Sequence, residues 1–269
     1  DEVQVIVELM GGCEEARVLV LEALRAGKSV VTANKALLAR HGKEIFDAAQ
    51  ENSSHVYFEA SVGGGIPIIR SIREGLVANK IRGIYGIING TSNYILTEMA
   101  RAKQPFDTVL QEAQEKGYAE AESALDVDGH DAADKLSVLA ACAYGLSVSP
   151  EQIFTEGIAK LTPQDFDYAK ELGFGIKPLA IATESGDQVT LRVHPAMIAE
   201  SHLLATVDGV YNAVYVVGDP VGHIMLFGRG AGAGPTASAV VGDLVEAVRD
   251  LVRENSTPIL LPSQTQPLS

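Results

Sequence analysis

Residues 3–38, VQVIVELMGGCEEARVLVLEALRAGKSVVTANKALL, decide the fold of this chain. The stretch alternates between runs rich in β-branched residues, which favour strands, and runs with apolar residues on one helical face. The predicted elements are a strand over Val3–Leu9, a helix over Glu14–Ala26, a strand over Ser29–Thr32 and a helix over Lys35–Ala49. Strand, helix, strand, helix in this order indicates a parallel sheet with right-handed crossovers.

This opening predicts only part of a doubly wound nucleotide-binding sheet. Such a sheet normally begins with a strand, a glycine-rich turn and a helix. No such unit precedes Val3 in the sequence, so we expect the chain to begin inside that domain.

The middle of the chain predicts a second α/β part. Its expected elements are helices through Ile68–Leu76, from Asn93 to a stop at Gly117, and over Asp131–Tyr144, with strands over Ile81–Ile88, Phe174–Thr183, Val189–Met197, Val210–Val217 and His223–Phe227. A last helix is expected over Pro235–Arg253, where Pro235 suits the first turn. We therefore predict an α/β protein with two parts: residues 1–55 and 232–269 form a partial doubly wound nucleotide domain, and residues 56–231 form an α/β domain with a mixed sheet.

The composition is that of a soluble globular protein, with 46% hydrophobic and 21% charged residues. A formal net charge of −14 argues against a nucleic-acid partner, because such proteins gather Lys and Arg on one face. No apolar run approaches the roughly 20 residues that span a bilayer. We expect a cytoplasmic protein without membrane or nucleic-acid partners.

An acidic cluster between Gly117 and Lys135 is the densest group of polar residues in the chain. Asp131 and Lys135 are four apart, so they share a face of the predicted helix. One reading is a solvated helix start, where acids complement the helix dipole. The other is a functional site, since the helix is otherwise apolar and a lysine one turn in would be partly buried, with its pKa lowered towards that of a useful acid.

Asn34-Lys35 lies where a parallel strand passes into a helix, which is the edge at which α/β sheets bind ligands. A cation at a helix N-terminus opposes the dipole, so no local structural reason favours Lys35 there. A solvated surface lysine is the alternative.

Two glycine-rich loops stand out. Residues 228–234, GRGAGAG, match GxGxxA between a strand and a helix, but no acidic strand follows. We interpret this loop as a close-approach segment whose N–H groups face a substrate or nicotinamide. The loop Gly63–Gly65 follows Glu59 and could offer carbonyls and a carboxylate to a hard cation, or be an ordinary turn.

Several motifs resemble those of homoserine dehydrogenases, and they follow the family order over nearly the whole chain. They are ELMGG at 8–12, VTANKAL at 31–37, EASVGGGIP at 59–67, INGTSNYI at 88–95, the cluster from Glu120 to Lys135, and residues 230–244.

The resemblance implies a Rossmann-like nucleotide domain and the NADP- or NAD-dependent interconversion of L-aspartate 4-semialdehyde and L-homoserine, a step of threonine, methionine and isoleucine biosynthesis. Lys135 would be the general acid, with Lys35 as the other candidate. The substrate would be held by Glu120, Asp126, Asp131, Gly90 and Thr91. The nicotinamide side would be lined by Gly11, Gly12, Asn34, Lys35 and Gly232, and a monovalent cation, sodium, by Glu59, Val62, Gly64 and Ile66. A homodimer is also implied.

Two alternatives remain beside this interpretation. Because no GxGxxG precedes Asp1, the chain is expected to bind the dinucleotide weakly or not at all, and it could instead be a non-catalytic dimer module derived from such an enzyme. An acylating semialdehyde dehydrogenase would need a nucleophilic cysteine with an activating base. Cys13 and Cys142 both lie in segments predicted to be helical and buried, which disfavours that chemistry.

Overall fold

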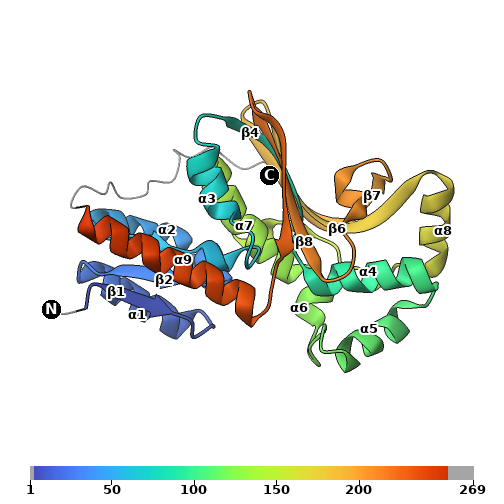
Figure 1. The fold of residues 1–269 in the computed structure, drawn as a ribbon, viewed down its shortest axis with the longest axis horizontal. Coiled ribbons are helices and arrows are strands. Elements are labelled where there is room, and N and C mark those ends of the chain that lie inside the picture. Colours follow the sequence, from blue (N-terminus) through green and yellow to red (C-terminus); the bar gives the residue numbers. More distant parts are fainter. Residues whose placement is uncertain (1–2, 254–269) are drawn as a thin grey trace.

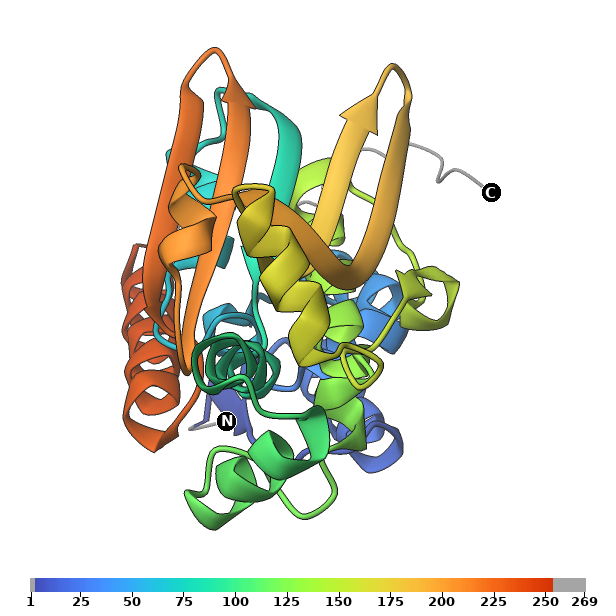
Figure 2. The same ribbon diagram turned by 90° about the vertical axis from the view of Figure 1, so that its right-hand side faces the viewer.

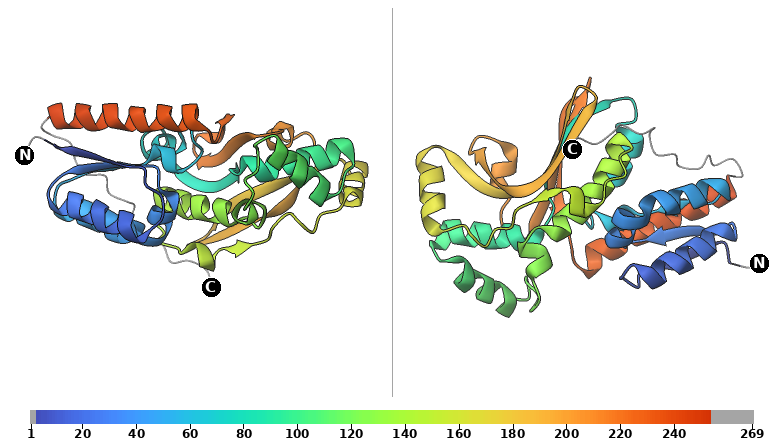
Figure 3. Two further views of the ribbon diagram at one scale, coloured as in Figure 1. Left: turned by 90° about the horizontal axis from the view of Figure 1, so that it is seen from below. Right: turned by 180° about the vertical axis from the view of Figure 1, so that it is seen from behind.

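A three-stranded parallel sheet forms the first part of the fold in the computed structural model, which describes residues 3–253 (Figure 1). Its strands are β1 (Val5–Glu8), β2 (Ser29–Thr32) and β3 (Val56–Tyr57), in the order β1-β2-β3. Seen from below in Figure 3, α9 (Ala233–Val252) covers one face, and α1 (Glu14–Arg25) and α2 (Lys35–Glu51) cover the other. Alternate residues of β2 therefore enter two cores: Val30 joins the core with α1 and α2, and Val31 the core with α9.

A six-stranded mixed sheet forms the second part, in the order β5-β7-β6-β4-β8-β9. Its strands are β4 (Lys80–Ile87), β5 (Phe154–Thr155), β6 (Phe174–Ser185), β7 (Gln188–Ala199), β8 (Tyr211–Asp219) and β9 (Gly222–Arg229). Only β5 and β7 pair in parallel. Figure 2 shows the hairpins β6–β7 and β8–β9 on either side of β4.

The other helices and helical turns follow β3 in the chain, and the first three of them connect the parallel sheet to the mixed sheet. They are η1 (Glu59–Ser61), α3 (Ile68–Arg70), η2 (Ser71–Gly75), α4 (Gly90–Ala102), α5 (Phe106–Glu115), α6 (Ala124–Val127), α7 (His130–Tyr144), η3 (Pro150–Gln152), α8 (Pro163–Glu171) and η4 (Leu203–Thr206). The apolar face of α7 packs into the same core as β4 and β6, which fixes the polar start of α7 beside the end of β4. Within residues 3–253, every helix is too short or too polar to cross a bilayer.

The predicted fold class is confirmed: a parallel sheet of the nucleotide-binding type stands beside a mixed sheet. The predicted helix through Ile68–Leu76 is instead a short α-helix that widens into a π-helical turn. The division of domains at residue 55 stays a prediction, although β3 pairs with β2 and so belongs to the parallel sheet. Of the range 232–269 assigned to the nucleotide domain, residues 254–269 lie outside the described residues.

Candidate active site

A cleft of about 720 Å³ lies where the carboxyl edge of the parallel sheet meets the mixed sheet. This volume falls within the range of roughly 300–1,000 Å³ that is usual for small-molecule sites. Nine of the residues predicted from the sequence line it: Lys35, Gly64, Gly90, Thr91, Glu120, Asp126, Asp131, Lys135 and Gly232. Six do not: Gly11, Gly12, Asn34, Glu59, Val62 and Ile66.

Lys135 is held in a fixed position near the start of α7. Its Nζ donates to Asp131 Oδ2 at 2.7 Å and to the carbonyl of Ile88 at 2.8 Å. The side chain is only 12% exposed. The helical spacing therefore pairs the two side chains as predicted, and the apolar surroundings of α7 keep the ammonium group partly buried.

Asp131 lies between two lysines from different parts of the chain. Its Oδ2 accepts from Lys135, and its Oδ1 lies 3.2 Å from the Nζ of Lys35, which begins α2. Burial opposes ionisation of this carboxyl, but Lys135 and Lys35 outweigh burial and lower the pKa of Asp131 to about 2. The site thus holds one fixed carboxylate between two ammonium groups.

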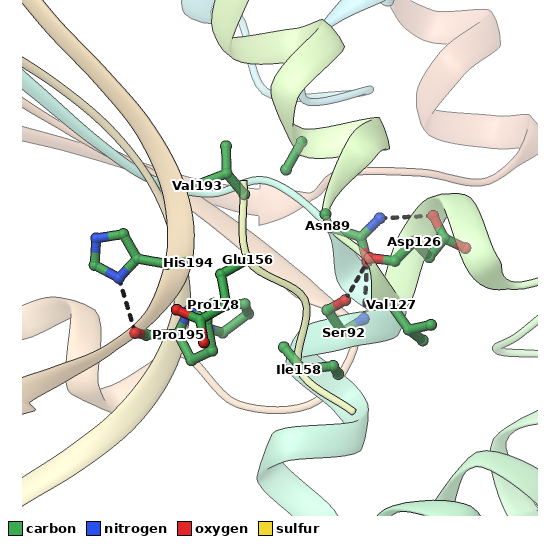
Figure 4. A pocket seen from close by; sticks show the side chains of 12 residues that line it. Asn89, Ser92, Asp126, Val127, Glu156, Ile158, Pro178, Val193, His194 and Pro195 are labelled. Atoms are coloured by element: carbon green, nitrogen blue, oxygen red, sulfur yellow. Dashed lines mark hydrogen bonds between the residues drawn. The ribbon is translucent and has the colours of Figure 1, made fainter. Parts of the chain in front are cut away.

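Asn89, which the sequence analysis did not select, connects the acids of the site. Its Oδ1 accepts the Ser92 N–H and so caps α4, while its Nδ2 donates to Asp126 at 2.7 Å and to Asp131 at 2.8 Å. Figure 4 shows Asn89 directed towards Asp126. One amide therefore sets the spacing of two predicted substrate-binding carboxylates, and the Asn-Gly pair at the end of β4 was its only signal in the sequence.

A second network places Lys35 at the sheet edge. Glu8 Oε2 accepts from the Thr32 hydroxyl, and Thr32 Oγ1 accepts the Asn34 N–H. Asn34 then caps α2 through Oδ1 and donates from Nδ2 to the carbonyl of Gly12 at 2.7 Å. The loop of Gly11 and Gly12 is thereby tied to the start of α2, beside the cleft although not in its lining.

The two glycine-rich loops contact each other through their backbones. The Gly65 N–H donates to the carbonyl of Arg229, and a Cβ on Gly64 would lie 2.6 Å from the Gly230 carbonyl oxygen. Gly232, with φ of 107°, is the N-cap of α9. The interpretation of residues 228–234 as a close-approach loop fits this packing, although the close neighbours are other parts of the same chain.

Changing Gly64 to Ala should lower the free energy of unfolding by roughly 2–4 kcal/mol, since Gly64 combines a left-handed backbone with this contact. Its φ is +53°, and the nearest atoms to an added Cβ are backbone atoms, which cannot rotate away. Urea unfolding measures the loss. Gly27→Ala is the matched control, because Gly27 has φ of +71° with nothing within 4 Å. An equal loss in both variants would contradict the contact.

Glu59 is the first residue of η1, and its side chain reaches the first turn of α3. Its two carboxylate oxygens accept the N–H groups of Ile69 and Arg70, each at 2.8 Å, and its own N–H donates to Asp243. Burial raises the pKa of Glu59 to about 7, against the effect of the two N–H donors. Val62 and Ile66 are also buried, and they follow Glu59 closely in the sequence. The predicted cation ligands therefore all come from the segment 59–66.

The cysteines do not support acyl-transfer chemistry. Cys142 is buried in α7, and burial raises the pKa of its thiol to about 12, which leaves no thiolate nucleophile. The prediction for Cys13 was wrong, because it is half-buried and precedes α1 as its N-cap. No group of three or more His, Cys, Asp or Glu side chains in residues 3–253 could hold a metal ion.

Comparison with known proteins identifies the family of this chain. The homoserine dehydrogenase domain family matches residues 67–245, and the family described as homoserine dehydrogenase, NAD binding domain, matches residues 1–59. The chain belongs to the homoserine dehydrogenase family. Homoserine dehydrogenase of Synechocystis sp. is 50% identical over 265 residues, which are 97% of this chain and 61% of that protein.

Solved structures of homoserine dehydrogenases show the same fold. One from Thiobacillus denitrificans has a TM-score of 0.96 at 50% identity and matches 99% of this chain and 64% of its own. A hyperthermophilic archaeal homoserine dehydrogenase in complex with NADPH has a TM-score of 0.79 at 29% identity, over 91% of this chain and 72% of its own. The chain thus spans about three fifths of the Synechocystis homoserine dehydrogenase.

Proposed function

We propose that this chain carries the catalytic site of a homoserine dehydrogenase, which interconverts L-aspartate 4-semialdehyde and L-homoserine with NADP or NAD. The observation that carries the proposal is the arrangement of Lys135, Asp131 and Lys35 in one cleft at the carboxyl edge of the parallel sheet. Ligands bind at this edge in open α/β sheets. A cytoplasmic homodimer acting in threonine, methionine and isoleucine biosynthesis is part of the proposal.

The charges in the cleft fit an amino-acid aldehyde. The carboxylates of Glu120, Asp126 and Asp131 lie along it and would hold the substrate ammonium. The Nζ of Lys135 would give its proton to the carbonyl oxygen during reduction, because a cation is needed where alkoxide charge develops. In the reverse direction the same nitrogen takes the proton of the homoserine hydroxyl. Lys35, on the opposite side of Asp131, is the other candidate for this role.

The glycine loops fit the nicotinamide half of a dinucleotide. Gly11 and Gly12 have φ of +74° and +72° with open space where a Cβ would lie, and Gly232 lines the cleft. These residues, with Asn34 and Lys35, would hold the nicotinamide side, and the nicotinamide would supply or accept the hydride at the substrate carbon. NADPH in the archaeal relative supports this class of cofactor.

The test is homoserine-dependent reduction of NADP by the 269-residue chain, with equilibrium titration of NADP in parallel. Because the chain is expected to bind the dinucleotide weakly, the expected result is turnover that rises with NADP up to high concentrations of the cofactor. The alternative is a non-catalytic dimer module, for which binding and turnover are both absent while the chain still associates into dimers. Sedimentation analysis of the same sample follows that association.

The proposal includes a sodium site at Glu59 with the carbonyls of Val62, Gly64 and Ile66. The fit rests on the buried carboxylate of Glu59. Its oxygens accept the N–H groups of Ile69 and Arg70 and still have lone pairs for a cation. The segment that follows Glu59 packs against the Gly230 loop through Gly64. Hard cations prefer such oxygen ligands.

Sodium chloride should raise the melting temperature of the unaltered chain relative to choline chloride at equal ionic strength, because a bound ion stabilises the folded state. Glu59→Gln should abolish this difference between the two salts, and Glu115→Gln, an exposed carboxylate on α5, should keep it. An unchanged sodium effect in Glu59→Gln would rule out this site.

A further inference from the structure

Arg40 forms a second ion pair between the two helices that already share the pair of Lys35 and Asp131. Its Nη1 donates to Asp134 Oδ1 at 3.0 Å, and its Nη2 lies 3.1 Å from Glu151 Oε1. Lys35 and Arg40 belong to α2, whereas Asp131 and Asp134 belong to α7. Two cations therefore face two carboxylates between these helices, and only the pair of Lys35 and Asp131 lines the cleft.

The guanidinium of Arg40 lies against the first turn of α2, close to Lys35. Besides its bond to Asp134, Arg40 Nη1 donates to the carbonyl of Ala36 at 3.4 Å. The guanidinium is therefore directed back towards the start of α2, where Lys35 is the first residue. Because like charges repel, a guanidinium that occupies Asp134 directs the ammonium group of Lys35 away from that carboxylate.

Asp134 is the nearest competitor of Asp131 for Lys35. The two carboxylates are three residues apart on α7, so they are neighbours on the helix surface. The side chain of Asp134 is only 14% exposed. Burial raises the pKa of Asp134, while Arg40 and, to a smaller extent, Lys35 oppose that rise. Lys35 is therefore already within electrostatic reach of Asp134, and its side chain is long and flexible.

A gain in stability does not account for the pair of Arg40 and Asp134. Because burial raises the pKa of Asp134 in spite of Arg40, the ionised carboxylate lowers the stability of the fold at neutral pH. A buried ion pair that brings no net stability can still select one arrangement of its neighbours. The arrangement at stake here is the choice of Lys35 between two carboxylates.

We propose that Arg40 is a positioning residue, which binds Asp134 and thereby leaves Lys35 to pair with Asp131 inside the cleft. The inference rests on the proposed function, because it assigns to Arg40 an effect on the catalytic site. Without Arg40, Asp134 would be a buried carboxylate without a cation, whereas Asp131 would have two, Lys35 and Lys135. Since an unpaired buried charge is costly, Lys35 would move to Asp134 and leave the cleft.

The test compares Arg40→Met with the double variant Arg40→Met/Asp134→Asn in the steady-state oxidation of homoserine with NADP. Arg40→Met should lower kcat by about 5- to 30-fold, because the cleft loses one of its two ammonium groups. The double variant also lacks the competing carboxylate, so its kcat should recover to within about 3-fold of that of the unaltered chain. Arg40→Lys keeps a cation beside Asp134 and should retain kcat within the same limits.

Crystal structures of the same variants give a measurement that does not depend on turnover. In Arg40→Met, Lys35 Nζ should lie within ion-pair distance of Asp134 and no longer of Asp131. In the double variant, Lys35 Nζ should again lie beside Asp131. Circular dichroism checks that both variants keep the fold of the unaltered chain.

Arg17→Met is the matched control. Arg17 of α1 also binds an acid through its guanidinium, donating to Glu44 of α2 at 2.7 and 2.9 Å, but α1 and α2 cover the same face of the parallel sheet. Its loss should change neither kcat nor the position of Lys35, because it leaves Arg40 on Asp134.

The outcomes separate the inference from the proposed function. If the unaltered chain shows no turnover, the proposed function fails, and the position of Lys35 in the two crystal structures still decides the inference. If Lys35 stays on Asp131 in Arg40→Met, the inference is wrong. A double variant with the same loss of kcat as Arg40→Met would also overturn it, because Arg40 would then only join the two helices.

Discussion

Lys135→Met should lower kcat for homoserine oxidation by about 100- to 10,000-fold, which is the usual contribution of a positioned proton donor or acceptor. The Nζ of Lys135 is fixed by Asp131 and by the Ile88 carbonyl, so the substitution removes an ammonium group that is already positioned in the cleft. Methionine keeps the length and apolar stem of lysine, and the packing of α7 should survive. Steady-state kinetics with NADP and homoserine give kcat, and circular dichroism confirms the fold.

Lys43→Met is the matched control for this substitution. Lys43 also forms a lysine–aspartate pair four residues apart, with Asp47, but on the exposed face of α2. Its kcat should equal that of the unaltered protein. Lys35→Met decides between the two candidate proton donors: if it abolishes turnover while Lys135→Met does not, the acid is Lys35 and the assignment to Lys135 is wrong.

Periodicity in the sequence located the long elements well because each of them buries one face. The predicted β2 has the bounds observed, and the predicted α7 differs by one residue at its start. Short elements were missed: α6 and β5 have four and two residues, too few to show a period. The helix α8 was also missed, although the sequence contains a local signal for it: a capping box of Thr162 and Asp165 with Pro163 in the first turn.

The candidate site was predictable where its geometry is local. Asp131 and Lys135 share a helical turn, and the position of Lys35 follows from the rule for parallel sheets. The contact between Lys35 and Asp131 depends on how α2 packs against α7. This packing cannot be predicted from the spacing of residues in the sequence. Asn89 was missed for the same reason, since its role depends on contacts with residues more than 30 positions further along the chain.

Asp131→Asn should lower the free energy of unfolding by about 2 kcal/mol at pH 7, judged from the shift of its pKa from 3.8 to about 2. A carboxyl whose folded pKa is depressed contributes stability above its ordinary pKa, and this contribution is lost as the pH falls through the folded value. The difference between the variant and the unaltered protein should therefore be full at pH 7 and shrink between about pH 4 and pH 2. Urea unfolding across this range measures it.

Asp134→Asn tests whether the effect belongs to Asp131 or to any acid on α7. Burial raises the pKa of Asp134, in spite of its ion pair with Arg40 at 3.0 Å. The sign is therefore opposite: ionised Asp134 costs stability once the pH exceeds its ordinary pKa, and its replacement should leave the free energy of unfolding at pH 7 unchanged or higher. A loss in Asp131→Asn that is the same at pH 3 and pH 7 would mean that packing, not the two lysines, accounts for it. In that case the carboxylate would not be the group that holds Lys135 and Lys35 in one cleft.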